Sequence, residues 1–458
     1  MIEDEGKIDH HVKGRVVFAN KTRYVILILG LLCILITNAN MNTINFTVIC
    51  MQDVIEEQQE QNQTHWLENS ADVSTVFASG SIGAVVGLIL FVPLTTQFGI
   101  RAVLSFYGLT AAFGTLIVPF AVSIGFLPVV IARILQGFGA SILFSAIGVI
   151  SEGWSPISEI STYIAFLSSG FQISNIIMMP ASGILCESSL GWRSIYYIFG
   201  GFGVIVFILF LYFFRDDASL HKNVSHKELR KISVGKNPTS NDKSVPYLAV
   251  CKDRVVLSIW ASAIGGNMSL MCLMQYGPIY LNKVLGLDVR DTGFSNAIPY
   301  IFAAIVKFIA GPLSDHMTFI PELWRVIFFA VVSQAGMGCG FFVMAATNNR
   351  VVAQLAYTIA IVLAGINIVG RSRQHVHFVM AVISLSAWIA IFLLPVIIGF
   401  ACPDHTHAQW AVFYVCLGIF VFIMNVPFPF FATLESAEYT KPGWKERKIQ
   451  KIYQDQKI

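Results

Sequence analysis

The sequence predicts an all-α membrane protein in which twelve transmembrane helices form two six-helix bundles. Hydrophobic residues make up 55% of the 458 positions and charged residues only 12%, whereas soluble proteins carry about 25% charged residues. Apolar runs long enough to cross a bilayer as helices recur along the chain. A long polar segment divides these runs six and six, which indicates two parallel repeats.

Each apolar run is expected to be a helix, because no segment alternates like a barrel strand and only these two structures satisfy their backbone in lipid. The expected spans are 24–50, 73–93, 101–121, 126–150, 161–185, 192–214, 255–281, 293–314, 323–345, 350–370, 376–400 and 409–432. No small-residue cleavage site follows the first run, so we expect it to remain in the protein.

The distribution of Lys and Arg predicts the orientation. Five lie before the first span, nine between Arg215 and Arg254, and six from Lys441 onward, whereas the expected outer loops hold only four. The positive-inside rule therefore predicts cytoplasmic termini. The expected parts are a tail (1–23), a first bundle (24–214), a cytoplasmic middle loop (215–254), a second bundle (255–432) and a tail (433–458).

The outer loops and the cysteines complete the expected surface chemistry. Asn62 begins an Asn-Gln-Thr glycosylation sequon in the first outer loop. The eight cysteines are scattered without paired spacing, so we expect packing residues and neither a disulfide framework nor a metal site. The net charge of +3 is too small to indicate a nucleic-acid partner. The plasma membrane and a lysosomal or vesicle membrane both remain open.

Arg133 stands inside the apolar stretch LPVVIARILQGFGASILF. Arginine stays charged in proteins, and a charge at bilayer depth is costly unless something receives it. Gln136 and Gly137 share its helical face, which suits the wall of an aqueous cavity. Two roles are equally compatible with this pattern: binding an anionic group of a substrate, or holding backbone carbonyls of a neighbouring helix.

Further polar residues lie within the expected spans. Asn38 and Asn42 form a stripe with Met41 and Asn45 on the first span. We favour a cavity lining for this stripe over helix–helix hydrogen bonding, which remains the alternative. The other candidates for substrate binding are Ser79, Asn267 and Asn367. Lys307 is interpreted as a lysine that extends toward the cytoplasmic side, with substrate contact as the alternative.

Several segments together resemble one branch of the major facilitator superfamily, the solute carrier family 17 anion transporters. This branch includes sialin, the vesicular glutamate transporters and the type I sodium–phosphate cotransporters. The resembling segments are RILQGFGASILF (133–144), WSPISE (154–159), PASGILCESSLGWRSIYYIFGGFG (180–203), SHKELRKI (225–232), GIN (365–367) and QWAVF (409–413). The resemblance implies the major facilitator fold and the transport of a small anion.

The chain departs from this family at most of its charged positions. The family's arginines of the first and seventh helices fall on Met41 and near Gly266, and its second-helix histidine falls near Ser79. The fourth-helix glutamates fall on Gln136 and Ala140. The aspartate of the superfamily's loop motif falls near Thr96 in the first half, whereas its second-half counterpart is present as Asp315, for which we expect a gating or structural role.

The expected function is secondary transport of a small polar solute, an organic anion or phosphate, by alternating access. The lost charges leave two alternatives: a carrier of a neutral or zwitterionic solute, and a receptor or scaffold that no longer transports. The sequence has no Asp or Glu in the middle of an expected span, which favours facilitated diffusion or exchange over proton coupling, with a co-transported ion as an option. We expect no enzyme activity and no cofactor, and a protein that works as a monomer in the bilayer.

Overall fold

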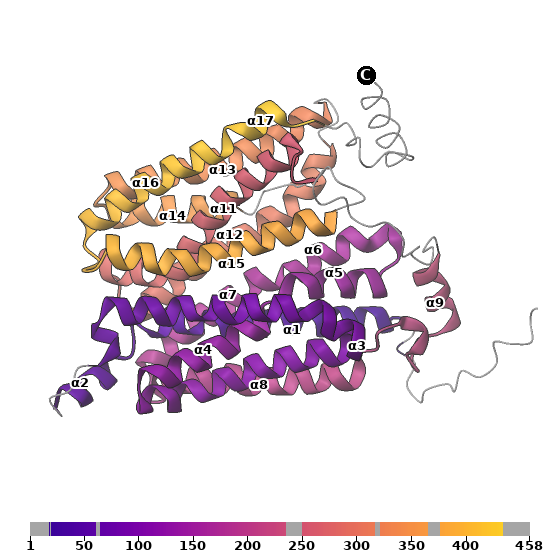
Figure 1. The fold of residues 1–458 in the computed structure, drawn as a ribbon, viewed down its shortest axis with the longest axis horizontal. Coiled ribbons are helices and arrows are strands. Elements are labelled where there is room, and N and C mark those ends of the chain that lie inside the picture. Colours follow the sequence, from indigo (N-terminus) through magenta and orange to yellow (C-terminus); the bar gives the residue numbers. More distant parts are fainter. Residues whose placement is uncertain are drawn as a thin grey trace, which may run out of the picture. The chain divides into compact units, whose positions relative to one another are not determined.

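The computed structural model describes Phe18 and residues 20–60, 65–234, 250–316, 321–364 and 376–433, with the side chains of 92, 310–316, 322, 326 and 376–381 left aside. Within these ranges the regular structure is helical throughout (Figure 1). Among the described residues, eleven helical segments are long and apolar enough to cross a membrane. The tenth expected span begins as the shorter helix α14 (Arg350–Ala364), and its remainder lies outside the described residues.

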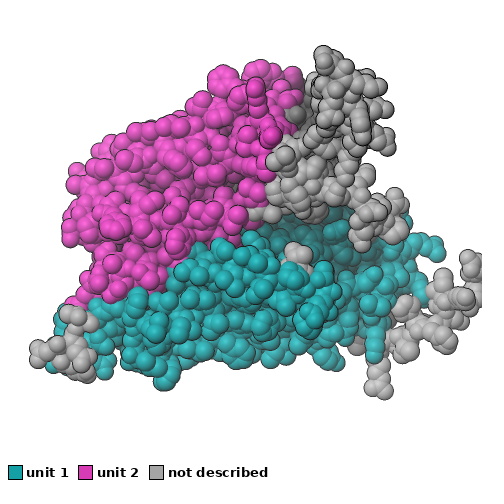
Figure 2. All heavy atoms as spheres, viewed as in Figure 1, with its two compact units in different colours: residues 1–66, 79–239 teal, residues 67–78, 240–458 magenta. Residues whose placement is uncertain are grey.

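The chain divides into two compact units (Figure 2). Unit 1 contains residues 1–66 and 79–239, and unit 2 contains residues 67–78 and 240–458. The helices mainly of unit 1 are α1 (Thr22–Thr47), α2 (Gln52–Glu60), α3 (Ser70–Ile124), α4 (Phe126–Ala140), α5 (Leu143–Trp154), α6 (Ile160–Ser168), α7 (Gly170–Glu187), α8 (Gly191–Phe213) and α9 (His226–Ser233). Those of unit 2 are α11 (Arg254–Ile279), α12 (Val289–His316), α13 (Glu322–Ala346), α14, α15 (Val376–Ala401), α16 (His407–Asn425) and α17 (Pro427–Phe431).

The long helix α3 contains two of the expected spans, which are separated by a break at Gly99. The backbone there has a φ of 78°, a left-handed conformation that glycine adopts without steric cost. A Cβ at this position would lie 2.5 Å from Oδ2 of Asp216. The other carboxylate oxygen of Asp216 accepts a hydrogen bond from the Arg101 backbone N–H at 2.6 Å. The turn between the second and third spans is therefore anchored to the segment that follows α8.

Within unit 1, α3 and α4 come into backbone contact. A Cβ on Gly137 would lie only 1.7 Å from the carbonyl oxygen of Gly80. Small residues allow such approaches between helices in membranes, where packing rather than hydrophobic burial drives association. This contact brings Arg133, one turn earlier on α4, close to α3 and α1.

One expectation from the sequence is wrong: Cys50 and Cys186 form a disulfide, with their Cα atoms 5.9 Å apart. They are separated by 136 residues, so their spacing along the chain gave no sign of pairing. The helices α1 and α7 lie side by side within unit 1, and the two cysteines follow or end these helices at the same level. The pairing is therefore a consequence of helix packing.

Candidate functional site

Arg133 lies completely buried in unit 1, with none of its surface exposed. Its Nη1 donates hydrogen bonds to the backbone carbonyl of Met41 at 2.9 Å and to Oε1 of Gln136 at 2.8 Å. Gln136 in turn donates from Nε2 to the hydroxyl oxygen of Thr115 at 2.9 Å. These bonds link α1, α4 and the third span of the bundle through neutral acceptors.

Little free space surrounds the Arg133 guanidinium, because Gly80 of α3 packs closely against it. A Cβ on Gly80 would lie 3.2 Å from Nη2 of Arg133 and 2.6 Å from Cε of Met41. The described hydrogen bonds of Arg133 match one of the two roles expected from the sequence, in which the guanidinium holds a neighbouring helix by a backbone carbonyl of that helix. Direct contact between Arg133 and a substrate stays a prediction.

The asparagine stripe on α1 is largely buried. Asn38 is 6% exposed and Asn45 is 4% exposed, while Asn42 is partly buried. Asn45 donates from Nδ2 to Oδ1 of Asn42 at 3.2 Å, which links two members of the stripe. Nδ2 of Asn38 and Oδ1 of Asn45 have no hydrogen-bond partner within the described structure.

Of the remaining predicted residues, Ser79 belongs to the same unit as Arg133, whereas Asn267 and Lys307 belong to unit 2. Ser79 is buried on α3 next in sequence to Gly80. Asn267 joins two helices of unit 2, because its Nδ2 donates to the Ile383 carbonyl at 3.0 Å and to the Ser386 hydroxyl at 2.8 Å. Lys307 is half-buried on α12. Asn62, Asn367 and the side chain of Asp315 lie outside the described residues.

Sequence reasoning missed a polar contact inside unit 2. The Tyr357 hydroxyl on α14 lies 2.5 Å from Oδ1 of Asn296 on α12 and 3.2 Å from the Leu273 carbonyl oxygen on α11, so two acceptors share its single hydrogen. A Cβ on Gly277 would lie 2.2 Å from this hydroxyl. A single tyrosine in an apolar helix resembles ordinary packing, so only the position of Asn296 within a span signalled this site.

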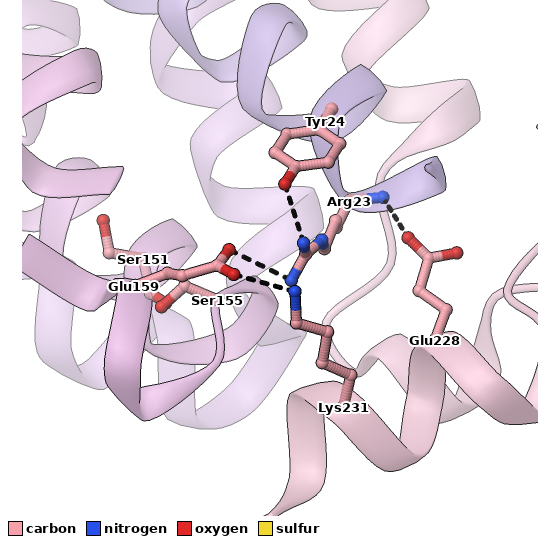
Figure 3. Close-up of polar contacts among 7 residues, drawn as sticks. All are labelled: Arg23, Tyr24, Ser151, Ser155, Glu159, Glu228 and Lys231. Carbon is pink, nitrogen blue, oxygen red and sulfur yellow. Dashed lines mark hydrogen bonds and ion pairs between the residues drawn. The ribbon is translucent and has the colours of Figure 1, made fainter. Parts of the chain in front are cut away.

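A second missed feature is a charged cluster at the N-terminal end of α1 (Figure 3). Nη1 of Arg23 lies 3.1 Å from Oε2 of Glu159, and Nζ of Lys231 lies 2.8 Å from Oε1 of the same carboxylate. Oε1 of Glu228 accepts the backbone N–H of Arg23 at 2.8 Å. The cluster attaches α9 to the start of α1 and to the turn that precedes α6.

The sequence of α9 explains why it forms a helix at this place. The Ser225 hydroxyl accepts the backbone N–H of Glu228 at 3.2 Å and so caps the first turn. Glu228 lies in the first turn and Lys231 in the last, which is the favourable arrangement with the helix dipole. The same two side chains then make the contacts with Arg23 and Glu159.

Comparisons with known proteins find a similar helical architecture in solved structures. The chain is similar to the crystal structure of a D-xylose–proton symporter with a TM-score of 0.66 and 16% identity, covering 88% of this chain and 97% of that one. It is also similar to a bacterial homologue of the human lysosomal transporter Spinster, with a TM-score of 0.65 and 14% identity. That alignment covers 90% of this chain and 97% of the other. The family model of the Major Facilitator Superfamily matches residues 27–372. The chain belongs to this superfamily.

Relatives in the superfamily narrow the branch. Human sialin is 28% identical over 342 residues, which cover 72% of this chain and 69% of sialin. Human sodium-dependent phosphate transport protein 1 is 31% identical over 256 residues, or 54% of this chain and 53% of that protein. A probable small intestine urate exporter of mouse is 24% identical over 383 residues, or 80% and 78% of the two chains. This chain is therefore a multi-pass membrane protein and a secondary transporter of a small solute, not an enzyme.

Met41 and Gly266 lie at two positions where the resemblance implies charged side chains in the family, and other side chains pack closely there. The Met41 side chain lies against Gly80, and its carbonyl receives the Arg133 guanidinium. A Cβ on Gly266 would lie 2.6 Å from Nε2 of Gln334, so Gln334 occupies the space into which a longer side chain would extend. The Met41 carbonyl and the Gln136 amide, which accept hydrogen bonds from Arg133, are thus uncharged groups at positions where the resemblance implies charged side chains in the family.

Proposed function

We propose that this transporter carries an organic anion, or phosphate, across a membrane by alternating access. The observation that carries the proposal is the completely buried Arg133, whose described acceptors are a backbone carbonyl and a side-chain amide. A buried guanidinium stabilises an anion in the same bundle by about 2 kcal/mol at about 8 Å, with an effective dielectric constant of about 20. The names of the relatives, which include phosphate and urate, support the same charge.

Arg133 has two parts in this proposal. It holds α1 through the Met41 carbonyl, and its charge favours an anion in the cavity that the asparagine stripe and Ser79 would line. Direct contact would require α1 and α4 to separate during the transport cycle. The proposal also includes four residues of the second half. Asn267 and Asn367 would bind substrate, and Asp315 and Lys307 would have gating or structural roles.

Coupling to protons is not expected, because no carboxylate lies in the middle of a span. We propose exchange, facilitated diffusion or coupling to another ion, and sodium is the first ion to test because a relative is described as sodium-dependent. Imposed sodium and pH gradients across proteoliposomes distinguish these modes. Acceleration of uptake by a pH gradient alone would contradict this part of the proposal.

The disulfide and the charges of the loops support one orientation. Disulfides form in oxidising compartments, and Cys50 and Cys186 lie at the C-terminal ends of α1 and α7. These ends would face the exterior or an organelle lumen, together with the Asn62 sequon. The termini, rich in Lys and Arg, would then be cytoplasmic, in the plasma membrane or in a lysosomal or vesicle membrane. The protein would function as a monomer.

Counterflow in proteoliposomes tests the proposal. Proteoliposomes that contain the purified protein are loaded in turn with sialic acid, glutamate, phosphate, urate and glucose, and exchange of labelled solute is measured. We expect exchange of at least one anion, and at least a tenfold loss of the rate in Arg133→Met. The absence of exchange with any solute in folded protein would favour a receptor or scaffold. Exchange of glucose alone would favour the neutral-solute alternative, which Met41 and Gly266 motivate.

A further inference from the structure

Helix α1 packs in parallel and in one register with α6 and α7, which follow one another along the chain. A Cβ on Gly30 would lie 3.2 Å from Cδ2 of Leu167 on α6, and one on Gly170 of α7 would lie 3.0 Å from Cγ2 of Ile34. At the other end the disulfide joins Cys50 to Cys186. All three contacts join residues 136 or 137 positions apart, so one register holds along α1 from Gly30 to Cys50.

This register places Asn38 level with Ser174 and Asn175. Asn38 follows Ile34 by one helical turn, and Ser174 follows Gly170 by one turn, so both point toward the seam where Ile34 meets Gly170. The three residues are at least nine-tenths buried, with 6%, 0% and 1% of their surface exposed, respectively. We call this place the α1–α7 seam.

Each of the three residues presents a polar atom that has no hydrogen-bond partner in the described structure. These atoms are Nδ2 of Asn38, Oγ of Ser174 and Oδ1 of Asn175. A buried polar atom without a partner costs about 1–3 kcal/mol, and native proteins keep few of them. Three at one level of one seam indicate a place that is completed by a polar ligand.

The chemistry of the three atoms defines the ligand group. Asn175 donates from Nδ2 to the Phe171 carbonyl at 3.1 Å, which fixes the orientation of its amide and leaves its Oδ1 as an acceptor. The Ser174 hydroxyl can donate and accept, and Asn38 offers an N–H. A carboxylate oxygen only accepts, so it would meet the unpaired lone pairs of Asn175. A hydroxyl or an amide both donates and accepts, and it satisfies the whole set.

We propose that the α1–α7 seam is a binding subsite for a hydroxyl or amide group of the transported solute. The proposal rests on the proposed anion transport and deepens it: the solute is an organic acid that also carries a hydroxyl or an amide group. The Met41 carbonyl that Arg133 holds is three residues beyond Asn38, about 4.5 Å along the helix axis. The neutral group of one small solute binds in the seam while its acidic group lies within the field of Arg133.

The test uses purified full-length protein and measures binding by thermal stabilisation. The probes are gluconate, which carries hydroxyls, N-acetylglycine, which carries an amide, and hexanoate, which carries neither, at equal sodium concentration. The variants are Ser174→Ala and Asn38→Ala. Thr43→Ala is the matched control, because Thr43 is buried on the same helix and its hydroxyl already donates to the Ala39 carbonyl at 2.8 Å.

We expect wild-type protein to bind gluconate or N-acetylglycine more tightly than hexanoate. Ser174→Ala and Asn38→Ala should each weaken that binding roughly three- to tenfold, the effect of one hydrogen bond, and leave hexanoate binding unchanged, whereas Thr43→Ala should bind all three probes as wild type does. Unchanged binding in both seam variants would overturn the inference, as would tighter binding of hexanoate by wild-type protein. Exchange of phosphate without binding of gluconate or N-acetylglycine would overturn only the inference, whereas no binding or exchange of any anion would overturn the proposed function as well.

Discussion

Removing the disulfide between Cys50 and Cys186 is expected to destabilise unit 1 strongly. The bond closes a loop with a sequence separation of 136 residues. The chain-entropy relation gives an upper limit of about 5 kcal/mol for such a loop at 25 °C. The unfolded state in a bilayer keeps its helices inserted and is less free than a soluble chain, so we expect a loss of about 2–4 kcal/mol.

The assay is the temperature at which detergent-solubilised protein loses its monodisperse elution peak. In a domain of 150–250 residues each kcal/mol shifts the Tm by about 2–4 °C, so Cys50→Ser should lower the Tm by roughly 5–15 °C. The double variant Cys50→Ser/Cys186→Ser should melt at the same temperature as either single variant, because all three lack the same bond. Reductant should lower the Tm of wild-type protein and leave the variants unchanged.

Cys33→Ala is the matched control, since Cys33 is a buried free cysteine of the same helix. It should retain the response to reductant. Equal Tm values for wild type and both single serine variants, together with free thiols at both positions by mass spectrometry, would refute the disulfide and the register of α1 and α7 that depends on it.

Three further predictions concern contacts outside the seam. Tyr357→Phe removes the hydroxyl that reaches Asn296 and the Leu273 carbonyl, so it should cost about 1–3 kcal/mol in the free energy of unfolding; a Tm equal to that of wild type would show that the hydroxyl is not needed. In a double-mutant cycle, Arg23→Ala and Glu159→Ala should show a coupling of about 1 kcal/mol in stability, modest because Glu159 is 31% exposed; strictly additive effects would contradict the ion pair. Burial lowers the pKa of His221 below its ordinary value of 6.5, although the hydrogen bond with the Phe213 carbonyl opposes this shift. The stabilising contribution of His221 should therefore be complete above about pH 6.5 and be lost as the pH falls through the folded pKa. The Tm of wild type should fall more steeply below pH 6.5 than that of His221→Gln, and parallel profiles would exclude this role.

Hydrophobicity made the helices predictable. An apolar run of this length has few stable alternatives in lipid, because its backbone must satisfy its own hydrogen bonds. The spans around Arg133 and along α1 therefore lie close to their predicted bounds. The expected boundary between the second and third spans encloses Gly99, where the helix breaks, whereas the interruptions between α4 and α5 and between α6 and α7 lie inside single expected spans and were not predicted.

The candidate site was predictable in part. A charge or an amide inside an apolar span is visible in the sequence, which is how Arg133, Asn38 and Asn267 were found. The partner of each side chain was not visible: the Met41 carbonyl for Arg133 and the Ile383 carbonyl for Asn267 are backbone groups that every residue carries. Ser174 and Asn175 were overlooked because one hydroxyl and one amide in a helix are ordinary until the neighbouring helix is placed beside them.

The sequence by itself determined that the chain crosses a membrane as helices, that these divide into two sets, and that one arginine is buried among them. The tertiary structure alone decided that Cys50 meets Cys186, that Arg133 holds a carbonyl of α1, and that Asn38 lies level with Ser174. The reason is physical: hydropathy is a property of each segment, summed along the chain, whereas register and pairing depend on which side chains leave room for two helices to approach.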